Sequence, residues 1–181
     1  GIPKKLPAPI NSDASEGSIS ESADGATVIS SRRPDGFGGI DIWRINQLDD
    51  KSLQAENLGP IVNTELFDYS PFLAPDGSYL IFGSYRKGKH GQADLFISFN
   101  KGNDEWTVPI NMNSCGAKIN NTTAHHSNPS LSPDGKYLFF RRHEARMEMD
   151  VYWVNADVIE KLKIKALRDE LYNAVDDGDL E

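Results

Sequence analysis

Short apolar runs alternate with polar turns along most of the chain. Runs rich in β-branched and aromatic residues occupy 27–29, 79–82 and 137–140, and each follows a turn centred on Asp-Gly. Such residues fit the pleated surface of a strand, and Pro-Asp-Gly favours a tight turn because proline presets φ and glycine accepts positive φ. The pattern predicts β-hairpins up to about residue 155.

Landmarks recur three times in the same order. Each unit has an asparagine, an Asp-Gly turn whose aspartate lies thirteen residues later, and an Asp-apolar-aromatic triplet 15–17 residues after the glycine. Four short antiparallel strands every 50–60 residues are typical of a propeller blade. The asparagines are Asn11, Asn63 and Asn121, the turns are 23–25, 75–77 and 133–135, and the triplets are 41–43, 94–96 and 150–152.

The C-terminal segment changes to a helical period. Val158, Leu162, Leu167, Leu171 and Val175 are spaced near 3.6 residues, which predicts an amphipathic helix over 157–175. We expect its apolar stripe to dock on the last blade, or else to act as a tether or a partner-binding helix. The predicted organisation is three repeats within 1–155 (about 6–57, 58–114 and 115–155), followed by a helix and tail at 156–181.

The segments 132–140 and 37–43 resemble the TolB-type propeller repeat, and the resemblance covers about residues 6–155. The first unit departs from the repeat, with Ala23 in place of the turn proline. The resemblance implies an all-β fold of six blades, of which three repeats make half. The ring would be completed by blades that precede Gly1 or by a second copy in a homodimer. It also implies a periplasmic or secreted protein, although this sequence contains no signal peptide.

Composition narrows the function classes. Of 181 residues, 38% are hydrophobic and 25% charged, with a net charge of −8. The acidic balance argues against a nucleic-acid partner, and no apolar stretch is long enough for a membrane span. Cys115 is the single cysteine, which excludes an internal disulfide and a cysteine-cluster zinc site.

Eight residues before each turn aspartate stand Glu16, Asp68 and His126. In the resembling family the innermost strand starts near one mouth of the central channel, which implies a polar, ligand-binding ring there. His125, His126 and His143 are candidate ligands for a divalent metal. The alternative is hydrogen-bonded histidines without a ligand, because adjacent side chains on a strand point to opposite faces.

Each triplet aspartate lies close in sequence to an arginine. We expect the pairs Asp41–Arg33, Asp94–Arg86 and Asp150–Arg142 to tie the long loop of each unit to its third strand. The alternative is solvated surface charge, which contributes little to stability. The triplet aromatics are expected to fill the layers between blades.

The sequence lacks a Gly-x-Ser-x-Gly elbow, a Walker-type loop and a His-Glu-x-x-His motif. No catalytic residue is identified and no cofactor is required. The predicted function is a non-enzymatic binding or scaffold module that recognises a protein or a carbohydrate at the channel mouth. The alternatives are a metal-dependent polysaccharide lyase, which the resemblance includes, and an accessory propeller of a larger enzyme.

Overall fold

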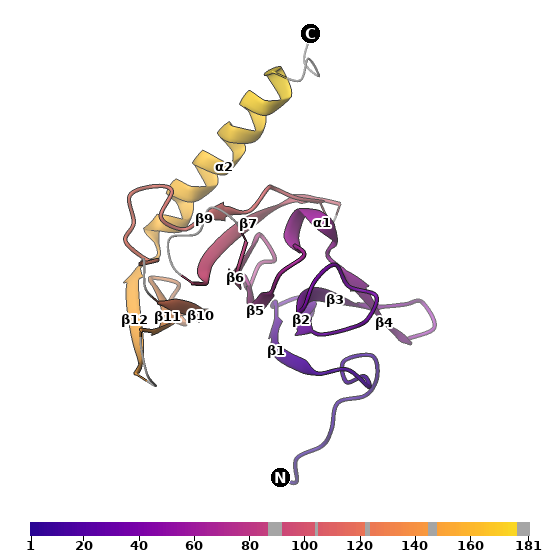
Figure 1. Ribbon diagram of the computed structural model, residues 1–181. Helices are drawn as coiled ribbons and strands as arrows, with labels where there is room; N and C mark the ends of the chain where they lie inside the picture. The colour runs from indigo at the N-terminus through magenta and orange to yellow at the C-terminus, as the bar shows by residue number, and fades with distance from the viewer. Residues whose placement is uncertain (87–91, 104, 122–123, 145–147, 177–181) are drawn as a thin grey trace.

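Three antiparallel sheets, one for each repeat, follow one another along the chain in a computed structural model (Figure 1). The structure describes residues 1–86, 92–103, 105–121, 124–144 and 148–176. The first sheet has the order β1-β2-β3-β4, and the second has the order β5-β6-β7-β8 with β9 also paired to β7. The third has the order β10-β11-β12. The predicted all-β, propeller-like fold is confirmed.

The strands coincide with the apolar runs and triplets of the repeat, and the Asp-Gly turns join the first two strands of each sheet. The strands of the first sheet are β1 (Glu16–Glu21), β2 (Thr27–Ser31), β3 (Asp41–Gln47) and β4 (Leu53–Asn57). Those of the second are β5 (Asp68–Leu73), β6 (Tyr79–Ser84), β7 (Asp94–Gly102), β8 (Glu105–Trp106) and β9 (Ile110–Asn111). Those of the third are β10 (His125–Leu131), β11 (Tyr137–His143) and β12 (Met149–Asn155), and the helices are α1 (Gly59–Val62) and α2 (Asp157–Asp176).

The third sheet differs from the prediction of four strands. Within the described part of the chain it has three, because the chain turns from β12 directly into α2. Asn155 starts the helix: its side-chain oxygen accepts a hydrogen bond from the main-chain N–H of Asp157 at 2.9 Å. Among the described residues, the outer edge of β12 therefore lacks the fourth strand that β4 and β9 supply to the other sheets.

The first strand of each unit lies on the inner side of the assembly. β5 packs against β1 on one side and against β10 on the other. Single parallel bridges join Ile40 to Phe67 and Ala93 to His125, so each unit is linked to the next at the beginning of its first strand.

Two apolar layers hold the units together. Val28 and Ile42 of the first sheet pack with Leu80, Phe82 and Phe96 of the second. Side chains on the opposite face of the second sheet pack with the third sheet and with the start of α2. That second layer contains Ile81, Leu95, Ile97, Leu138, Phe140, Val158, Leu162 and Ala166.

The helix predicted over 157–175 is observed at Asp157–Asp176. Its first half is buried in the layer between the second and third sheets, so it docks there and not on the last blade alone. Leu167, Leu171 and Val175 of the predicted stripe are exposed, and the end of α2 projects away from the sheets (Figure 1). No helix in the described residues is long and apolar enough to cross a membrane.

Candidate binding rim

The predicted ring residues lie at the beginning of the inner strands, but their side chains serve their own turns. Asp68 and His126 are fully buried, and Glu16 is partly buried. Each side chain accepts a hydrogen bond from a main-chain N–H four or five residues earlier, which closes the turn before the strand. The donors are Ser12 at 2.9 Å, Thr64 at 2.7 Å and Asn121 at 3.3 Å.

His126 is held as a neutral imidazole. Its Nδ1–H donates to the Ala93 carbonyl at 2.9 Å, which leaves Nε2 to accept from the Asn121 N–H. Burial lowers the pKa of His126; the hydrogen bond to the Ala93 carbonyl and the nearby Asp94 oppose this in part, and the positive charge of Arg142 adds to it. For Glu16, burial opposes ionisation, but hydrogen bonds from Ser12 and the charge of Arg33 prevail and lower its pKa.

The arginines pair differently from the prediction. Arg86 forms a 2.9 Å ion pair with Asp68, and Arg33 lies 4.0 Å from Glu16, so both turn toward the inner strand and not toward Asp94 or Asp41. Arg142 faces the neutral His126 and lies 3.7 Å from Glu144. Each guanidinium also lies over the aromatic ring of its triplet: Trp43 at 5.2 Å, Phe96 at 5.0 Å and Tyr152 at 4.2 Å.

Neutral groups donate hydrogen bonds to the aspartates Asp41 and Asp94. Asp41 accepts hydrogen bonds from the main-chain N–H groups of Phe37 and Gly38 and from the Asn57 amide. Asp94 accepts one from the Asn111 amide at 2.8 Å. These bonds tie the outer strand to the third strand, and in the first unit they also hold the long loop. Asp150 is exposed on β12, which has no such outer strand within the described residues.

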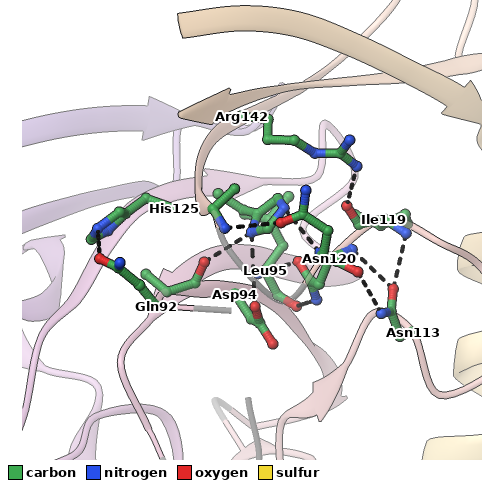
Figure 2. A network of polar contacts seen from close by, with 12 residues as sticks. Gln92, Asp94, Leu95, Asn113, Ile119, Asn120, His125 and Arg142 are labelled. Carbon is green, nitrogen blue, oxygen red and sulfur yellow. Dashed lines mark hydrogen bonds and ion pairs between the residues drawn. The ribbon is translucent and has the colours of Figure 1, made fainter. Parts of the chain in front are cut away.

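The repeated asparagine joins consecutive units. Asn63 Oδ1 accepts the Ile42 N–H at 2.8 Å, and its Nδ2 donates to the Ile42 carbonyl at 2.9 Å. In the third unit Asn120 makes the equivalent bonds to Leu95, at 2.8 and 3.0 Å (Figure 2). The third unit has one additional residue between this asparagine and the inner strand. Asn120, and not the expected Asn121, is therefore the structural equivalent of Asn63.

The three histidines do not converge on one point. His126 is buried with both ring nitrogens bonded, whereas His125 lies on the opposite side of β10 and contacts the Tyr85 hydroxyl and the Gln92 side chain. The rings of His125 and His143 are 5.9 Å apart. The described residues contain no group of three His, Cys, Asp or Glu side chains that could hold a metal ion.

Phe67 and His125, each one position ahead of a buried ring residue, belong to a row of aromatic and basic side chains. The Arg32 guanidinium is 5.4 Å from the centre of the Phe67 ring, which meets Tyr85 at 5.6 Å and 85°. Tyr85 in turn meets His125 at 5.6 Å, and their side chains hydrogen-bond at 2.8 Å. We call this row the rim: Arg32, Phe67, Tyr85, His125 and His143.

A cavity of about 390 Å³ opens beside the rim, between the first and second units. It is lined by Gly39, Glu65, Leu66, Phe67 and Tyr85. A side chain at Gly39 would overlap the Phe67 ring, because a Cβ there would lie 1.8 Å from a ring carbon. Burial raises the pKa of the Tyr85 hydroxyl, so it stays protonated as a hydrogen-bond donor.

Glu65 in the cavity lining and Arg32 behind the Phe67 ring have no ion-pair partner among the described residues. Within the described ranges, the Glu65 carboxylate also has no hydrogen bond. The spacing of the repeat did not predict this site. The sequence feature that could have indicated it is the residue just before a ring position, namely Phe67 or His125. Side chains alternate along a strand, so these two residues point to the face opposite the ring residues.

The chain is similar in fold to a solved propeller protein. TolB from Acinetobacter baumannii superimposes with a TM-score of 0.52 and 17% identity over 81% of this chain. The chain spans 32% of the length of that TolB chain. No family model and no curated protein matches the sequence. The likeness establishes a TolB-like fold.

Proposed function

We propose that the chain is a non-enzymatic binding module that recognises a segment of another protein at the rim. The observation that carries this proposal is the cavity of about 390 Å³, with perpendicular aromatic walls and the carboxylate of Glu65 in its lining. Ligand sites are concave and largely apolar, with a few polar groups that orient the ligand.

The geometry favours a peptide over a carbohydrate. A sugar ring stacks on an open aromatic face, but the Arg32 guanidinium already covers one face of Phe67. The space that remains is the corner between Phe67 and Tyr85, whose shape fits an apolar or aromatic side chain. Glu65 and Arg32 could then pair with charged groups on either side of that side chain.

An exported location is part of the proposal. The resemblance of the repeats to those of exported bacterial proteins and the TolB-like fold support it. A role as an accessory propeller of a larger enzyme is compatible with the same surface. The lyase alternative has less support, since His126 lies on the opposite face of β10 from His125 and His143, with both ring nitrogens bonded.

The proposal is tested on a peptide array and a glycan array, probed with the labelled chain. Phe67→Ala removes one wall of the cavity, and Phe37→Ala, at an exposed phenylalanine outside the cavity lining, is the matched control. We expect the wild type and Phe37→Ala to bind the same peptides and Phe67→Ala to bind them at least roughly tenfold more weakly. Binding to glycans alone, equal binding by all three proteins or no binding to either array would contradict the proposal.

A further inference from the structure

The third sheet has an outward face, on the side away from the second sheet. It is equivalent to the faces through which the first and second sheets contact the next unit. This face consists of Phe139, Val151 and Trp153. Val151 and Trp153 are 71% and 61% exposed. Phe139 lies opposite Trp153 in the register of β11 and β12. A contiguous apolar face on a sheet edge normally has a partner.

The register identifies the equivalents of these residues in the second sheet. Leu95 and Ile97 follow Asp94 at the same intervals as Val151 and Trp153 follow Asp150, and Ile81 lies opposite Ile97. All three side chains are fully buried against the next unit. In the first sheet, Val28 and Ile42 take two of these positions and are buried against the second sheet, and Arg44 takes the third. This face is therefore the surface on which a blade receives the following blade.

The first unit carries an asparagine at the position that joins the other two units to the unit before them. Asn11 stands at the position of Asn63 and Asn120, which both bond to the residue after the triplet aspartate in the preceding unit. The side-chain amide of Asn11 instead donates to the carbonyl of Leu6 within its own segment. In the third unit the residue after the triplet aspartate is Val151, which has the matching main-chain groups.

We propose that the outward face binds the first unit of a second copy of this chain, head to tail, with Asn11 bonded to the main chain of Val151. The same contact formed twice joins two sets of three blades into a closed ring of six, which is within the range of known propellers. Closure buries Val151 and Trp153 between the two copies. This inference concerns a different surface from the rim and stands independently of the proposed function.

Sedimentation and light scattering of the 181-residue chain test the proposal. We expect a particle of twice the chain mass of 20.1 kDa. Trp153→Asp or Val151→Asp should raise the dissociation constant by roughly 30-fold or more, because each places a charge at the centre of the interface. Leu171→Asp, at an exposed leucine of α2, is the matched control and should leave the dimer intact.

A crosslink locates the contact without depending on a destabilising change. In a Cys115→Ser background, Asn11→Cys combined with Val151→Cys should form an intermolecular disulfide, whereas Asn173→Cys with Val151→Cys should not. Circular dichroism confirms that each variant is folded. A monomer at all concentrations, or a dimer that Leu171→Asp disrupts and Trp153→Asp does not, would overturn the proposal. A monomer would indicate that the outward face contacts blades of a longer polypeptide instead of a second copy.

Discussion

The second and third sheets are built from the same repeat, yet their surroundings differ. The second sheet has a neighbouring unit on both faces, and its inner strand begins with Asp68 paired to Arg86. The third has a neighbour on one face, and its inner strand carries the neutral His126 beside Arg142. The repeat thus determines where a side chain lies in its sheet. Its burial and its charged partners depend on the neighbouring units.

The largest expected effect comes from the ion pair of the second unit. Asp68→Asn leaves the largely buried guanidinium of Arg86 without its carboxylate, so we expect a loss of about 3–5 kcal/mol in the free energy of unfolding. Glu16→Gln should cost less, about 1 kcal/mol, because its ion pair is longer and its carboxylate is less buried than that of Asp68. Urea unfolding measures both. Equal losses would show that the repeat position, and not the local pairing, sets the energy.

The second largest effect is the difference in stability loss between truncations at equivalent apolar positions of the second and third sheets. Leu95→Ala creates a cavity in a fully buried layer and should cost about 3 kcal/mol. Val151→Ala, at the equivalent exposed position, should change the stability of the dissociated monomer by less than about 0.5 kcal/mol. Chemical denaturation at low protein concentration measures the two changes. A large loss for Val151→Ala would show that its side chain is packed in the monomer.

The smallest effect is the dependence of stability on pH in the third unit. Because burial lowers the pKa of His126 below 6.5, the unfolded chain binds this proton more readily than the folded chain. The stability that neutral His126 contributes is complete above that pH and is lost as the pH falls below it. His126→Gln stays neutral, so the wild type should lose stability relative to this variant on acidification. Unfolding measured across that range checks the direction, and parallel curves would contradict it.

The repeat landmarks predicted most of the architecture. The Asp-Gly turns, apolar runs and triplets are local signals, and they place the strands and the boundaries of α2 within a residue or so. The same landmarks led to Asn121 where the structure uses Asn120, because one additional residue ahead of β10 changes the alignment while the spacing to the turn is conserved. Spacing alone does not distinguish these two asparagines.

The candidate site was less predictable. The repeat spacing singled out Glu16, Asp68 and His126, which close the turns before the inner strands, and the rim lies one residue earlier on the opposite face. A shift of one residue in a strand exchanges the two faces. Arginine partners were equally hard to assign, since a long side chain reaches several carboxylates and only the packed strands decide which is near.

The sequence by itself determined the all-β repeat, the three units and the terminal helix, because turns, strand propensity and helical period depend on near neighbours. Only the tertiary structure decided which carboxylate each arginine meets, that His126 is neutral and that Phe67 and Tyr85 form a cavity. It also separated the buried Leu95 from the exposed Val151. These outcomes depend on contacts between units far apart in the chain, whose distances and burial no local pattern records.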